Sequence, residues 1–243
     1  REESMANQNL FIPVTQDEKK DYQYEEAMKT LRTNIQFSGS GLKVIMLTST
    51  MPDEGKSETS SQLAISMAQT EGRVLFIDAD IRKSVLVSRF GFGQQIYGLT
   101  QYLTGQKLLG DILYHTNLPN LDIIFSGPMA PNPAELLGED AFARLVEWAR
   151  NEYDTIIIDT PPLGSVIDAA IISQRCDGAI LVVESGALSY RLVQKAKNQL
   201  ERTGCRILGA VLNRVDMAGS GYYHRYYGKY SKYSKYYENE SDK

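Results

Sequence analysis

Short apolar runs alternate with amphipathic stretches along most of this chain. The runs are rich in valine, isoleucine and leucine and lie at residues 43–48, 73–77, 121–125, 155–158, 179–183 and 206–212. Around and between them, apolar positions recur every three or four residues, as in an α-helix, over residues 22–37, 59–69, 141–151 and 188–201. Strands this apolar are buried on both faces. The pattern therefore predicts an α/β fold whose mainly parallel sheet is covered by helices on both faces.

Composition divides the chain into three parts. Residues 1–21 show no periodicity and predict a mobile arm. Residues 1–4, which precede Met5, are consistent with a tag, with a piece of a fused partner or with native sequence. Residues 22–216 predict one globular domain that begins with a helix at 22–37. Residues 217–243 open with a glycine-rich hinge and predict a flexible, tyrosine-rich tail.

The totals narrow the classes of function. With 243 residues, the chain can bury one substantial core, and its net charge of −4 argues against a protein that coats nucleic acid. Two cysteines in no metal-binding spacing favour a reducing cytoplasm. The two histidines, His115 and His224, also lack ligand spacing, and we expect His115 in a surface loop. No apolar run approaches the ~20 residues that cross a bilayer, so we expect a cytoplasmic protein that reaches a membrane only through a partner.

The stretch TSTMPDEGKS at 48–57 predicts a phosphate-binding loop between a strand and a helix. Gly55 lets the backbone approach an anion, and successive N–H groups at the helix start supply partial positive charge. Lys56 would reach the β- and γ-phosphates, and the Ser57 hydroxyl would hold Mg²⁺. The loop is a deviant Walker A motif, because Thr50 stands where the common pattern has Gly.

Two further strands end in acidic side chains. Asp78 and Asp80 follow one apolar run, and the alternation of an extended chain places both on the same side. Asp159 ends another run and precedes two prolines that stop the strand, as in a Walker B motif. Taken alone, acids at these positions are as typical of strands that simply end in solvated residues as of a metal or nucleotide site. Together with the loop they predict a site for a magnesium-bound nucleoside triphosphate at the carboxyl edge of the sheet.

This combination resembles the bacterial tyrosine kinases, the cytoplasmic kinases of capsular and exopolysaccharide assembly. Their Walker A, A′ and B motifs look like SxxPxEGKS at 49–57, DADIR at 78–82 and IDTPP at 158–162. The resemblance spans residues 22–237 and takes in PNPAELL at 131–137, VLN at 211–213 and the tyrosine-rich end. The alternative is a spatial-organiser ATPase of the ParA or MinD type. Those proteins share the fold and the deviant loop, but they carry a signature lysine where this chain has Met51, and a glycine follows where it has Pro52.

The resemblance implies a protein-tyrosine kinase with a P-loop NTPase fold that uses ATP and Mg²⁺. It implies catalytic roles for Lys56, Asp78 and Asp80, with Asp78 accepting the phenol proton. The implied nucleotide-binding residues are Pro52, Asp53, Glu54, Gly55, Lys56, Ser57, Glu58 and Asn213, and the implied metal ligands are Ser57, Asp80 and Asp159. Ser84 stands where the family usually has Pro, and Glu58 where it usually has Thr. We expect neither change to touch the chemistry.

The tail concentrates eight of the fifteen tyrosines of the chain within residues 222–237, among basic residues and without an acid. A folded aromatic cluster would need more aliphatic residues, and a nucleic-acid-binding arm suits the acidic body poorly. Beside a kinase-like site, a set of phosphate acceptors fits best. These tyrosines are Tyr222, Tyr223, Tyr226, Tyr227, Tyr230, Tyr233, Tyr236 and Tyr237.

Assembly and partners follow from the resemblance. Glu26, Lys29 and Arg32 look like the family's Glu-x-x-Arg-x-x-Arg assembly motif, and their spacing also fits an ordinary intrahelical charge trio. The resemblance implies a ring of identical subunits and phosphorylation between subunits. It also implies a transmembrane co-polymerase that activates the kinase at the inner face of the plasma membrane, and a phosphotyrosine phosphatase, with no nucleic-acid partner. A regulatory scaffold modified by another kinase is a further alternative.

Overall fold

The computed structural model describes residues 11–12, 14, 22–70, 72–84, 86 and 96–215. Its strands are β1 (Phe11–Ile12), β2 (Val44–Ser49), β3 (Val74–Asp78), β4 (Leu113–Thr116), β5 (Leu121–Ile124), β6 (Thr155–Asp159), β7 (Gly178–Glu184) and β8 (Ile207–Asn213). Its helices are α1 (Tyr22–Phe37), α2 (Lys56–Ala68), α4 (Leu99–Leu103), α5 (Leu109–Ile112), α6 (Pro133–Gly138), α7 (Asp140–Glu152), α8 (Asp168–Ser173) and α9 (Tyr190–Glu201).

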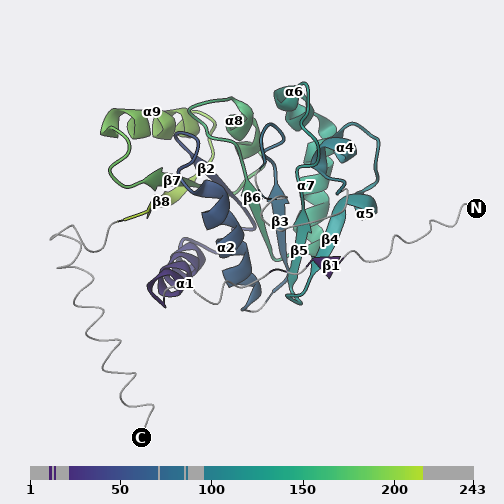
Figure 1. The fold of residues 1–243 in the computed structure, drawn as a ribbon, viewed down its shortest axis with the longest axis horizontal. Helices are drawn as coiled ribbons and strands as arrows, with labels where there is room; N and C mark the ends of the chain where they lie inside the picture. Colours follow the sequence, from purple (N-terminus) through teal and green to yellow (C-terminus); the bar gives the residue numbers. More distant parts are fainter. Residues whose placement is uncertain are drawn as a thin grey trace, which may run out of the picture.

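The strands form one sheet in the order β1-β4-β5-β3-β6-β2-β7-β8 (Figure 1). Neighbouring strands are parallel except for the antiparallel pair β4 and β5. The strand β2, which leads into the phosphate-binding loop, lies between β6 and β7. The sheet order therefore brings the carboxyl ends of β2, β6 and β3 side by side, where doubly wound sheets bind their ligands.

Each face of the sheet carries its own hydrophobic core. Alternate residues of β2 and β3 point to opposite sides, so Met46 and Leu75 join one core while Ile45 and Phe76 join the other. The helices α6, α7, α8 and α9 cover the first face, and α1 and α2 lie together on the second (Figure 1). The predicted α/β sandwich is confirmed for the central strands.

The two ends of the sheet differ from its centre. Two short strands, β1 and β4, were not expected from the sequence, and His115 lies in β4 rather than in a loop, with its Nδ1 atom 2.6 Å from the Asp122 carboxylate. Because β8 is the last strand of the sheet, its residues are half-buried or exposed, and the side chain of Leu212 is 43% exposed. Among the described residues, β8 is thus less buried than the central strands.

Across the described ranges, no helix is long and apolar enough to cross a membrane. The predicted tail at 217–243 and all of the predicted arm except residues 11, 12 and 14 lie outside the described residues. The domain boundaries at 22 and 216 therefore stay predictions.

Candidate active site

The phosphate-binding loop leaves β2 at Ser49 and enters α2 at Lys56. Two of its residues adopt positive φ angles, 66° at Asp53 and 83° at Gly55. A Cβ atom at Gly55 would lie 2.0 Å from the side-chain nitrogen of Asn213 at the end of β8. Two features therefore require glycine at position 55: the left-handed backbone conformation and the close approach of Asn213.

The carboxylate of Glu54 braces this loop. Glu54 is 2% exposed, and its two oxygens accept the N–H groups of Met51, at 2.7 Å, and of Glu184, at 3.1 Å. The Asn213 amide donates to the Glu54 carbonyl at 2.9 Å. Glu54 and Asn213 therefore tie the loop to β7 and β8, while Pro52 and Asp53 are exposed at its tip. In this arrangement the side chain of Glu54 faces the protein, so any nucleotide contact it makes would come from its backbone.

The first turn of α2 carries the predicted lysine and serine. The Lys56 ammonium lies 2.7 Å from Asp159 Oδ1 and 3.1 Å from the Ser57 hydroxyl, and the Ser60 hydroxyl donates to the same Asp159 oxygen at 2.9 Å. Lys56 and Asp159 are both buried, at 6% and 1% exposure. Removing one partner of a buried ion pair of this kind is costly, because the other charge is left buried without a partner. Glu58 lies in the same helical turn.

The register of the sheet sets Asp78 directly opposite Asp159 on neighbouring parallel strands. Asp78 is fully buried. Burial, followed by the charge of Asp159, raises the pKa of Asp78 to about 7, against the lowering effects of the Ser84 hydroxyl and the Lys56 ammonium. Asp80 continues from the strand end, where its N–H group donates to Asp78 at 3.2 Å.

The oxygens at this strand edge fit a magnesium ion. Asp159 Oδ2 is buried and has no hydrogen-bond partner among the described residues, which is costly unless a ligand supplies one. Carboxylate and hydroxyl oxygens are the donors that Mg²⁺ prefers, and the Ser57 hydroxyl lies beside the same Lys56–Asp159 pair. Among the described residues, no three histidine, cysteine or acidic side chains cluster closely enough to hold a metal by themselves. Mg²⁺ is usually held by one or two protein oxygens together with phosphates.

Ser84 corrects one expectation. Its hydroxyl donates to Asp78 Oδ2, so the departure from the family pattern does touch the proposed base. The sequence offers no signal for this contact, because a serine six residues beyond a strand end has many conformations open to it. The contact of Ser60 with Asp159 was also missed, because it depends on how α2 packs against β6. Gly164 was also missed: a Cβ atom there would lie 2.1 Å from the Thr50 carbonyl oxygen. A glycine near a strand end can signal such a close approach of two backbone segments.

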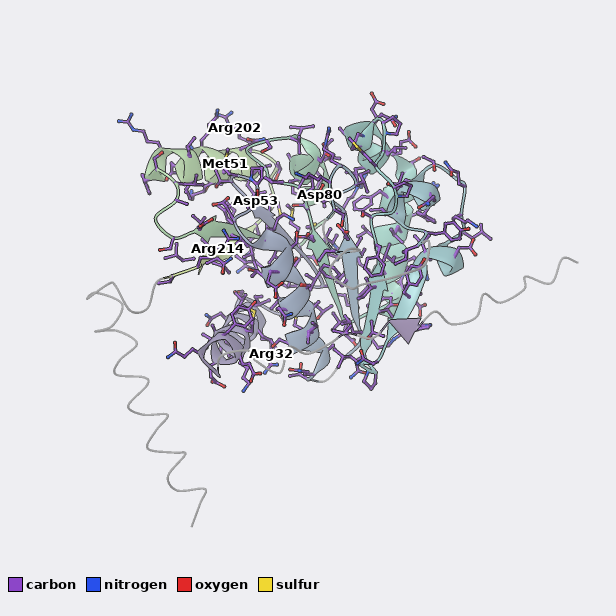
Figure 2. The ribbon with its side chains drawn as sticks, in the orientation of Figure 1. Arg32, Met51, Asp53, Asp80, Arg202 and Arg214 are labelled. Carbon is purple, nitrogen blue, oxygen red and sulfur yellow. The ribbon has the colours of Figure 1, made fainter. Side chains whose placement is uncertain are left out.

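The predicted loop and acid residues come together, whereas the assembly residues lie elsewhere. Figure 2 shows Met51, Asp53 and Asp80 on the same edge of the molecule, with Arg32 far from them on α1. Lys29 pairs with Glu26 at 2.7 Å, and the Arg32 guanidinium donates to the Ser66 carbonyl at 2.6 Å. In this chain Arg32 therefore fastens α1 to α2. The predicted acceptor tyrosines lie outside the described residues.

Comparisons with known proteins show which family the chain resembles in sequence and fold. The family model described as an AAA domain matches residues 42–204. A tyrosine-protein kinase CpsD of Streptococcus agalactiae is 47% identical over 204 residues, which cover 83% of this chain and 89% of that protein. The solved kinase domain of the Escherichia coli tyrosine kinase ETK is 32% identical with a TM-score of 0.74, covering 88% of this chain and 94% of that one. The crystal structure of the chimerical protein CapA2B2 is 32% identical with a TM-score of 0.77, covering 85% and 94%.

A more distant likeness concerns the fold alone. The septum site-determining protein MinD of Pyrococcus horikoshii, solved with Mg-ADP, is 24% identical with a TM-score of 0.61 and covers 73% of this chain and 72% of its own. At that identity the similarity establishes a shared P-loop NTPase-like architecture.

Proposed function

This chain belongs to the bacterial tyrosine-protein kinases, and from that premise we propose that it transfers the γ-phosphoryl group of ATP to tyrosines of its own C-terminal segment at 222–237. The observation that carries the proposal is the register that sets Asp78 beside Asp159 and, through it, beside Lys56. A candidate base, a cation and a metal-binding carboxylate then meet at the end of one phosphate-binding loop.

Positioning and charge stabilisation account for most of the catalysis of phosphoryl transfer. The loop amides and Lys56 would bind the phosphates, and Asn213 would contact the adenine. Bound Mg²⁺, held by Ser57, Asp80 and Asp159, would withdraw charge from the transferred group. The chain's own residues keep this region dry, because Lys56, Asp78 and Asp159 are all buried.

Asp78 is the proposed acceptor of the phenol proton. A free tyrosine has a pKa of about 10, and an ordinary aspartate, near 3.9, is a weak base toward it. Burial beside Asp159 raises the pKa of Asp78 to about 7, which brings it closer to the pKa of the tyrosine and makes Asp78 a stronger base. The same position at the end of β3 leaves the carboxylate next to the proposed phosphate site.

The acceptor segment has the reach for transfer within one chain or between chains. A fully extended chain of ~3.4 Å per residue would carry residues 222–237 at most roughly 25–80 Å from Arg214. We propose transfer between subunits of a ring, with Glu26, Lys29 and Arg32 at the contact. We further propose that a transmembrane co-polymerase recruits the kinase to the inner face of the plasma membrane and activates it. A phosphotyrosine phosphatase would reverse the reaction, and the cycle would regulate synthesis and export of capsular or extracellular polysaccharide.

The test is mass spectrometry of the intact protein and its peptides after incubation with Mg-ATP. We expect phosphotyrosine within 222–237 and none in a Lys56→Met variant. Mixing the Lys56→Met chain with active protein separates the two routes, since phosphate on the inactive chain requires transfer between subunits. Unmodified tyrosines, even with an activating membrane partner present, would refute the proposal. ATP hydrolysis stimulated by DNA or lipid, with no phosphotyrosine, would instead indicate the spatial-organiser ATPase.

A further inference from the structure

Ser84 forms a side-chain hydrogen bond with Asp78. Its hydroxyl donates to Asp78 Oδ2, and the Ser84 hydroxyl oxygen itself accepts the N–H group of Leu86 at 3.1 Å. The other carboxylate oxygen, Oδ1, accepts the Asp80 N–H group at 3.2 Å. Each oxygen of the buried carboxylate therefore has one donor, and these donors fix the plane of the group.

Ser84 is itself held in place by the segment between it and Asp80. The Asp80 carboxylate accepts the N–H groups of Arg82, at 3.3 Å, and Lys83, at 3.1 Å, which closes a tight turn. The Arg82 guanidinium then forms two parallel hydrogen bonds, of 2.7 and 2.9 Å, to the fully buried carboxylate of Asp168 at the start of α8. Such paired contacts are strong and directional. These contacts fix the turn that places the Ser84 hydroxyl against Asp78.

We propose that Ser84 is a positioning residue for phosphoryl transfer, whose hydroxyl holds the Asp78 carboxylate in the orientation that accepts the phenol proton. The inference rests on the proposed function, which assigns that proton to Asp78. A hydroxyl suits the task because it can both donate and accept, so the contact persists after Asp78 has gained a proton. The Asp80 N–H group can only donate.

The experiment compares variants that differ at this hydroxyl alone. Ser84→Thr keeps it, whereas Ser84→Val replaces it with a methyl group of similar size and Ser84→Ala removes it. Ser38→Ala is the matched control, because Ser38 is also half-buried but its hydroxyl donates to a backbone carbonyl, that of Asn34, in the helix that Ser38 follows. For each protein the rate of phosphotyrosine formation at saturating Mg-ATP, the dissociation constant of Mg-ADP and the melting temperature are measured.

We expect Ser84→Val and Ser84→Ala to slow transfer about tenfold, as losses of supporting hydrogen bonds commonly do. Nucleotide affinity should stay within about twofold, and Ser84→Thr and Ser38→Ala should retain the rate. An unchanged rate in Ser84→Val and Ser84→Ala would overturn the inference, as would losses of rate, affinity and melting temperature in parallel, which indicate a structural role alone. If the unmodified protein forms no phosphotyrosine under any condition, the proposed function itself has failed. If the unmodified protein does form phosphotyrosine, the rates of the Ser84 variants decide the role of Ser84 alone.

Discussion

Glu54 offers the sharpest test of how the phosphate-binding loop is built. Its buried carboxylate receives one N–H group from within the loop, at Met51, and one from β7, at Glu184. In Glu54→Gln the side chain keeps its shape, but one oxygen becomes an NH₂ group that cannot accept. One of the two backbone donors is then left buried without a partner.

The magnitude follows from the value of a hydrogen bond to a charged group. The loss of one such bond, with its buried donor left unpaired, should lower the free energy of unfolding by about 2–3 kcal/mol. For a chain of this size the melting temperature falls by about 2–4 °C per kcal/mol, or about 4–12 °C in total. The affinity for Mg-ADP should fall about tenfold, equivalent to about 1.4 kcal/mol, because the loop amides are no longer held ready for phosphate.

Thermal melts, urea titrations and nucleotide titrations of Glu54→Gln measure these changes. Asp53→Asn is the matched control for stability: it removes the same charge one residue away, at an exposed position whose positive φ asparagine tolerates, and should change stability by less than about 0.5 kcal/mol. Hydrogen exchange adds a local measurement, with faster exchange expected at the Met51 or Glu184 amide. If Glu54→Gln melts as Asp53→Asn does and binds Mg-ADP as the unmodified protein does, Glu54 does not brace the loop.

Three further predictions concern the same edge of the sheet and the opposite end. Lys56→Met leaves the Asp159 charge buried and unpaired, so calorimetry should show about 3–5 kcal/mol less stability, partly recovered by adding Asp159→Asn. Gly55→Ala should lose about 1–2 kcal/mol to backbone strain and also lose nucleotide binding; normal binding would contradict this. The last prediction concerns pH. Burial acts to raise the pKa of Asp177, but the Arg150 guanidinium and two backbone N–H groups outweigh it, and the pKa is lowered. Its ionised form therefore stabilises the fold fully above its unfolded pKa, and this is lost as pH falls through the lower folded pKa. Denaturant titrations should show a flatter acid limb in Asp177→Asn.

The local pattern of the sequence determined the central strands, the main helices and the loop. The apolar run at 155–158 became β6, and the helix expected at 22–37 is α1 to the residue, because side-chain direction along a strand or helix depends on neighbouring residues only. Gly55 was also readable, since few residues other than glycine accept its backbone. Family resemblance supplied roles that spacing alone left open, such as the proton acceptor.

Only the tertiary structure decided which of these residues meet. The opposition of Asp78 and Asp159 depends on the sheet order, and the bond from Glu184 to Glu54 joins residues 130 positions apart. Arg32 fits an assembly motif on its own helix, yet it donates to Ser66 of the next one. The contact of Ser84 with Asp78 depends on a turn braced by a third element. Such contacts form when distant elements pack, and a periodic pattern of apolar residues specifies which face is buried but not which polar atoms meet there.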